Sequence, residues 1–96
     1  MTAVVYDEER VCMTVEGHAD SAPYGEDLIC AQITALTQML ALYIETESAG
    51  GEAAVTSGYA SLRGTQTERI LFDAVALAFE CIAEQYPASV TFCRVG

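Results

Sequence analysis

The sequence contains no lysine, no tryptophan and only one histidine among its 96 residues. Four arginines, scattered along the chain, are outnumbered by fourteen acidic residues, which gives a formal net charge of −10 at pH 7. Proteins that bind nucleic acid need a basic stripe that displaces the counterions of the phosphates, so direct nucleic acid binding is not expected. Such acidity either steers basic polypeptides toward the protein or serves solubility alone.

A basic leader and a continuous apolar run are also absent from the N-terminus. Met1 is followed directly by Thr-Ala-Val-Val-Tyr, without the pattern of a signal peptide or a membrane span. We therefore expect a cytoplasmic protein with no membrane partner, in which four cysteines stay reduced: Cys12, Cys30, Cys81 and Cys93. Their spacing does not match the close-paired ligands of common zinc sites, so neither a metal nor another cofactor is expected.

Proline and glycine are few, at two and seven residues, and no low-complexity tract or long linker interrupts the chain. About half of the residues are apolar. A chain of this length supports one core of two helices against a small sheet but no second folding unit. We expect a single domain over residues 1–96.

The first half of the chain predicts a hairpin followed by a long helix. Residues 2–6 and 11–16 read as strands around a charged turn, with Val11, Met13 and Val15 facing the core. The helix is expected from Asp27 to about Ser48, before Gly50-Gly51. Its buried stripe should contain Ile29, Ile33, Leu36, Leu40 and Tyr43, broadened by Leu28, Ala35, Met39 and Leu42.

The second half predicts a strand, a helix and a last strand. Residues 53–59 read as a short strand and residues 60–66 as a polar loop that turns at Arg63-Gly64. Thr65 and Glu68 fit a capping box at the start of the second helix.

The inner face of the second helix is expected to contain Ile70, Leu71, Ala74, Val75, Ala78, Cys81 and Ile82. Residues 89–95 alternate and form the last strand. The predicted order is ββαβαβ, an α+β domain with one mixed sheet carrying two helices.

His18 and Cys30 carry the chemistry that the sequence suggests. His18 lies at the end of the second strand, and Cys30 lies in the first turn of the predicted helix. Amide groups there lack carbonyl partners and favour a thiolate, but the helix dipole contributes only about 0.3 to 1 kcal/mol, so an ion-paired imidazolium is needed as well. The pair fits a nucleophile and its base, with the same amides available to hold an oxyanion.

Two neighbours of Cys30 have alternative roles. Asp27 either caps the helix or orients His18 as a third catalytic member. We favour the cap, because a carboxylate beside Cys30 opposes thiolate formation. Thr34 either donates its hydroxyl to the sulfur or bonds back to its own helix. Against catalysis stands the commoner situation, in which a helical cysteine is a buried, inert side chain. Cys81, Cys12 and Cys93 read as packing residues.

The segments Gly17-His18-Ala19 and Tyr24-Gly25-Glu26-Asp27-Leu28-Ile29-Cys30-Ala31-Gln32-Ile33-Thr34 resemble the signature of the ribosomal-processing cysteine proteases, formerly described as ribosome-associated proteins. The resemblance extends over the whole chain through its length and the order of its elements. It departs from the family pattern at Thr34, where serine is common, although the hydroxyl is retained.

The resemblance implies a homodimeric cysteine endopeptidase that removes a short N-terminal extension from a large-subunit ribosomal protein. Cys30 is then the nucleophile, His18 the base and Asp27 the family's acidic residue. The substrate segment is basic, which gives the acidic composition a purpose. Two rival functions remain at this point: a non-catalytic ribosome-binding or assembly module of the same fold, and a thiol redox sensor with Cys12 as resolving cysteine.

Overall fold

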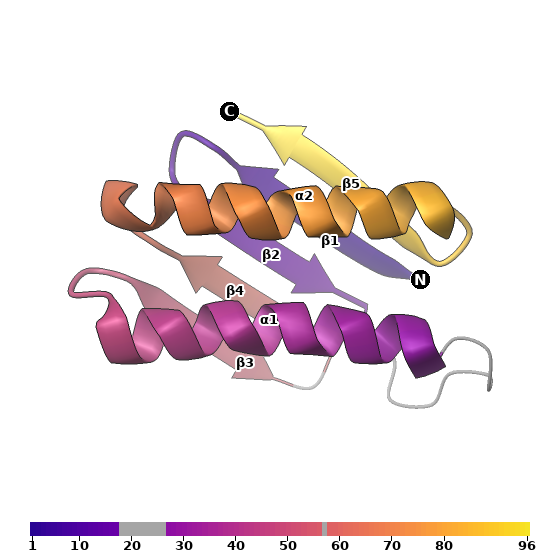
Figure 1. The fold of residues 1–96 in the computed structure, drawn as a ribbon, viewed down its shortest axis with the longest axis horizontal. Coiled ribbons are helices and arrows are strands. Elements are labelled where there is room, and N and C mark those ends of the chain that lie inside the picture. Colours follow the sequence, from indigo (N-terminus) through magenta and orange to yellow (C-terminus); the bar gives the residue numbers. More distant parts are fainter. Residues whose placement is uncertain (18–26, 57) are drawn as a thin grey trace.

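One mixed sheet carries two helices on the same face (Figure 1). The computed structural model describes residues 1–17, 27–56 and 58–96, without the side chain of Asp27. Within these ranges the elements are β1 (Thr2–Asp7), β2 (Cys12–Glu16), α1 (Asp27–Glu47), β3 (Glu52–Thr56), β4 (Tyr59–Arg63), the 3-10 turn η2 (Gln66–Glu68), α2 (Arg69–Gln85) and β5 (Val90–Val95).

The α+β class and the single mixed sheet with two helices are confirmed, and the order gains one strand to become ββαββαβ. The strand expected over residues 53–59 ends at Thr56, and Tyr59 together with residues 60–63, which were expected in a loop, forms β4 between β3 and β2. Thr56 pairs with Tyr59, so the chain reverses between them, and Gly58 has a φ of +80°. Only two apolar side chains of β4 point inward, Ala60 and Leu62, which is too short an alternation to mark a strand.

The sheet has the strand order β3-β4-β2-β1-β5. The predicted hairpin is confirmed, since β1 pairs antiparallel with β2, while β5 returns parallel to β1. Val11, Met13 and Val15 are buried as expected. The opposite face of the sheet has no helix over it (Figure 1).

The core lies between the sheet and the helices. In α1 the residues Ile29, Ile33 and Leu40 are buried as predicted, and Leu36 is partly buried. The predicted stripe was too broad, because Leu28, Met39, Leu42 and Tyr43 are exposed.

The inner face of α2 was predicted in part: Val75 and Ile82 are buried and Leu71 packs against the core as expected, but the helix is rotated relative to the rest of the predicted face. The buried residues are Phe72, Val75, Ala76, Phe79 and Ile82, whereas Ile70 is 81 % exposed and Cys81 is exposed. The two phenylalanines are the largest side chains of this helix that are fully buried, and their insertion against the sheet sets its rotation.

The predicted capping box is confirmed and connects the two helices. Thr65 and Glu68 exchange the expected hydrogen bonds at η2. Glu68 is only 5 % exposed, and its Oε1 accepts hydrogen bonds from Ser48 Oγ at 2.6 Å and from Thr65 N at 2.9 Å. Those donors hold the pKa of the Glu68 carboxyl below its ordinary value. The carboxylate therefore joins the residue after α1 to the start of α2.

We predict that Glu68→Gln lowers the urea midpoint of unfolding at neutral pH, because the charge that three donors stabilise is lost. A carboxyl with a lowered pKa in the folded state stabilises the fold above its unfolded pKa, about 4.3 for glutamate. Its contribution disappears as the pH falls through the lower, folded value. The difference between wild type and variant should therefore shrink in acid, while exposed Glu84→Gln serves as control. A difference that stays constant with pH contradicts this assignment.

Candidate active site

Cys30 lies in the first turn of α1, on the side of the molecule where β2 ends (Figure 1). Asp27 is the first helical residue, so Cys30 is the fourth rather than the third. Cys30 is not part of a disulfide, and it is partly buried. Side chains of a helix lean toward its N-terminus, which brings the sulfur toward the unpaired amides of that end. The expected placement of Cys30 at a helix start is therefore confirmed.

His18 and the side chain of Asp27 lie outside the described residues. The predicted Cys-His pair and the two roles considered for Asp27 thus remain predictions. The structure does describe Gly17, the residue directly before His18.

Gly17 occupies a position that only glycine suits. Its φ is +84°, and an added Cβ would lie 2.5 Å from the carbonyl oxygen of Met1. Its amide donates a hydrogen bond to Gly58 O at 2.9 Å. The end of β2 is thereby fixed between the N-terminus and the β3–β4 turn.

Thr34 lies one helical turn after Cys30 and is partly buried. It lines a pocket between α1 and the β3–β4 hairpin together with residues such as Ile33, Val55 and Ala60. Sequence reasoning did not find this pocket, because half of its lining belongs to the β3–β4 hairpin, whose second strand was not predicted. The alternation Ala60, Leu62 was the only signal available.

The remaining cysteines do not form a redox pair with Cys30. Cys12 alternates with buried Val11 and Met13, so its side chain lies on the face of the sheet opposite the helices, and burial raises its pKa. Cys81 lines a groove between the helices with Gln32 and Leu36, and Cys93 is exposed on β5. The redox hypothesis with Cys12 as resolving cysteine is wrong, because the sheet separates the two sulfurs.

All four arginines form contacts within the protein. The fourteen acidic residues outnumber them, so the net charge stays negative. Arg10, Arg63 and Arg94 pair with Asp7, Glu52 and Glu8, and Arg69 donates to the carbonyl of Glu8. Within the described ranges, no group of three or more His, Cys, Asp or Glu side chains is arranged to hold a metal ion.

A partly buried cysteine outside any disulfide, in the amide-rich first turn of a helix, is typical of a cysteine-dependent hydrolase. The family model described as Cysteine protease Prp matches residues 1–91. The chain therefore belongs to the cysteine protease Prp family, whose members are hydrolases.

Solved structures share the fold across nearly the whole chain. SMU.848 from Streptococcus mutans matches with a TM-score of 0.75 at 23 % identity, over 98 % of this chain and 95 % of that one. The essential ribosomal processing protease Prp from S. aureus, with a substrate peptide, matches with a TM-score of 0.75 at 18 % identity, over 97 % and 96 %. The same protease with a covalently linked product peptide gives 0.78 at 20 %, over 98 % and 99 %. A comparison with curated protein sequences gives no match.

We predict that Gly17→Ala destabilises the protein by about 1 to 3 kcal/mol from backbone strain alone, with a further cost from the contact with Met1. Urea unfolding measures the effect. Gly58→Ala is the matched control, because Gly58 shares the positive φ. If the two variants lose equal stability, the close approach to Met1 has no energetic weight.

Proposed function

We propose that this protein is an endopeptidase that removes a short, basic N-terminal extension from a large-subunit ribosomal protein in the cytoplasm. The observation that carries the proposal is Cys30 in the first turn of α1, within a chain whose family match extends over residues 1–91. The S. aureus relative was solved with a substrate peptide and with a covalently linked product peptide, which supports peptide cleavage through a covalent intermediate.

In the proposed mechanism His18 takes the proton of the Cys30 thiol, and the sulfur attacks the scissile carbonyl. The carbonyl oxygen gains negative charge, which the amides of the first turn of α1 stabilise. The amine leaves with the proton from His18, and water then cleaves the thioester. Asp27, in the first turn of α1, stabilises the helix start with its carboxylate, and Thr34 supports the sulfur from one turn away.

We predict that Cys30→Ala abolishes cleavage of a peptide carrying the basic N-terminal extension, and that His18→Ala lowers kcat/KM by about 100- to 10,000-fold. Mass spectrometry of the products measures both. Cys81→Ala, an exposed thiol on α2, is the control and should cleave as the wild type does. His18→Ala should also slow the alkylation of Cys30 at mildly acidic pH.

The rival function is a non-catalytic ribosome-binding module of the same fold. It requires the wild type and Cys30→Ala to bind the basic peptide equally and to leave it intact. Cleavage that persists in Cys30→Ala would instead show that another group performs the reaction.

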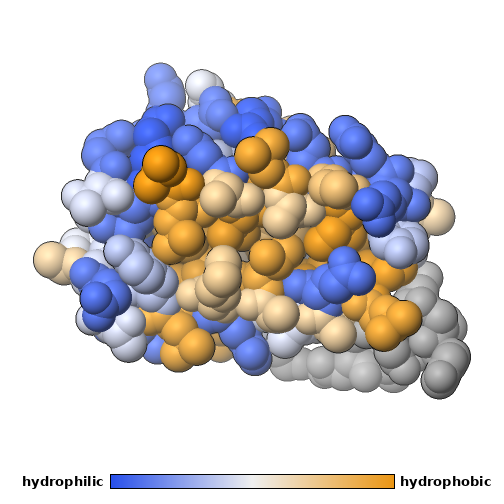
Figure 2. Space-filling view, viewed as in Figure 1, coloured by the Kyte–Doolittle hydropathy of each residue, from blue (hydrophilic) through white to orange (hydrophobic). Residues whose placement is uncertain are grey.

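We also propose that two copies associate through the outward face of the helices. Leu28, Met39, Leu42, Tyr43, Ile70 and Leu77 are exposed there, between 41 % and 81 %. Figure 2 shows a hydrophobic band across this helical face, with hydrophilic residues around most of its border. Residues 28–47 of α1 form a helix that is long and apolar enough to cross a membrane, judged by length and composition alone. Only 33 % of its most apolar stretch is buried within the protein. Exposed apolar surface on two neighbouring helices is typical of an interface.

We predict that the wild type sediments as a dimer and that Met39→Glu or Leu77→Glu converts it to a monomer, because each places a charge in the apolar band. Sedimentation velocity measures the mass. Val95→Glu, on the helix-free face of the sheet, should leave the dimer intact. A monomeric wild type, or co-sedimentation with phosphatidylcholine vesicles that the same charges abolish, would contradict the second copy as partner.

A further inference from the structure

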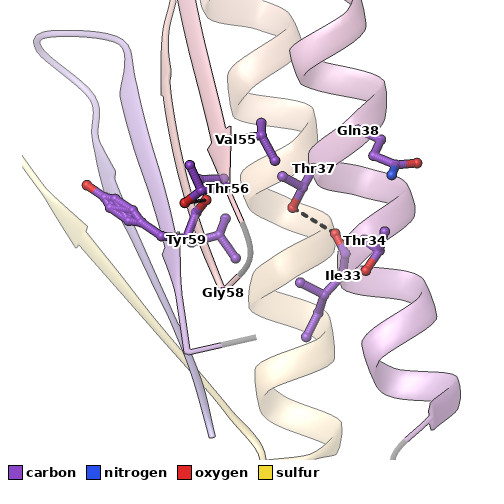
Figure 3. Close-up of a pocket in the computed structure, with 10 residues that line it drawn as sticks. Ile33, Thr34, Thr37, Gln38, Val55, Thr56, Gly58 and Tyr59 are labelled. Carbon is purple, nitrogen blue, oxygen red and sulfur yellow. Dashed lines mark hydrogen bonds between the residues drawn. The ribbon is translucent and has the colours of Figure 1, made fainter. Parts of the chain in front are cut away.

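A small pocket lies between α1 and the β3–β4 hairpin, and Thr34, which lies one helical turn after Cys30, is part of its lining (Figure 3). Its floor is one cross-strand row, in which Ala60 of β4 lies opposite both Val15 of β2 and Val55 of β3. The middle residue of this row has only a methyl group, which leaves the space. Val15 and Ala60 are each 3 % exposed, whereas Val55 on the edge strand is 51 % exposed, so the pocket opens to solvent at Val55.

The wall of the pocket comes from α1. Figure 3 shows Ile33, Thr37 and Val55 directed into the space between the helix and the hairpin. Thr37 donates its hydroxyl to Ile33 O at 2.8 Å, so this side chain offers its methyl group to the pocket. Among the described residues, no charged side chain lines the pocket, and its polar lining comes from neutral groups such as Gln38 and Thr34. Val15, Ile33, Val55 and Ala60 therefore offer a ligand an aliphatic surface without ions.

The pocket and the thiol lie along one side of the same helix. Cys30, Thr34 and Thr37 are spaced by four and three residues, which places them on one face. Four helical residues advance about 6 Å, whereas an extended peptide advances about 3.3 Å per residue. A peptide whose carbonyl lies at Cys30 therefore reaches the pocket with a side chain about two residues away.

We infer that this pocket binds one aliphatic side chain of the substrate, about two residues from the cleaved bond, and so determines which bond is cut. The inference rests on the proposed function, because it assigns Cys30 as the attacking group. Val55 is the specificity-determining residue at the open side, since its exposed side chain borders the entrance.

Cleavage of peptides with leucine or alanine at each position around the cut tests the inference. In the wild type, leucine at one position should raise kcat/KM about tenfold or more over alanine. Val55→Phe fills the entrance and should abolish this preference, so that the ratio of kcat/KM for the leucine peptide to kcat/KM for the alanine peptide falls to about one. Ala54→Phe adds the same ring to the same strand on the other face of the sheet and should keep the preference. Equal effects of Val55→Phe on both peptides would overturn the inference.

A second measurement requires no cleavage. Methyl NMR of the wild type with N-acetyl-leucinamide should show shifts at Val15, Ile33 and Val55, and N-acetyl-asparaginamide should not shift them. Absence of these shifts overturns the pocket assignment even when Cys30→Ala abolishes cleavage. Shifts in a wild type that cleaves no peptide support the pocket and contradict the proposed function.

Discussion

The packing of α1 against the sheet fixes the rotation of the helix, and the other features depend on that rotation. Ile33, Leu40 and Ile44 are buried almost completely on the inner face. With that face anchored, Thr34 lies toward the β3–β4 side, Cys30 lies one turn before it on the same face of the helix, and Met39 and Leu42 point outward. A rotation by one residue, about 100°, would move the thiol away from the pocket and bury a different set of side chains. The core thus determines where the chemistry lies.

The two ends of the molecule are held by different interactions. At the end remote from Cys30, Tyr6 donates its hydroxyl to Asp73 Oδ1 at 2.6 Å, and the Arg94 guanidinium lies 5.5 Å from the Tyr6 ring centroid. Burial and the bond to Asp73 raise the pKa of Tyr6. At the end near Cys30, the Gly17 amide donates a hydrogen bond to Gly58 O.

Sequence patterns predicted the elements better than their rotation. The hairpin, the extent of α1 and the Thr65–Glu68 capping box depend on local periodicity and local hydrogen bonds, which are written in neighbouring residues. The rotation of α2 depends on how Phe72 and Phe79 fit against the sheet, and β4 depends on its pairing with β2 and β3. The rotation of α2 and the formation of β4 both depend on tertiary contacts, which the periodicity of the sequence does not reveal.

The candidate site divides in the same way. Cys30 was predictable, because a helix start can be located from caps and spacing. The pocket was not, since Val15, Ala60 and Val55 come from three strands and meet only through their register.

In the proposed function, the acidic surface and the aliphatic pocket act over different distances. Charge attraction is screened over about 8 Å at physiological ionic strength and responds to the sum of charges, so it concentrates basic segments without choosing a bond. The pocket requires contact and therefore reads a single side chain at a fixed distance from Cys30. With a net charge of −10 and no lysine, the protein attracts basic peptides without distinguishing among them. Selection of the cleaved bond must then come from close contact, so the β3–β4 hairpin rather than the charged surface determines specificity.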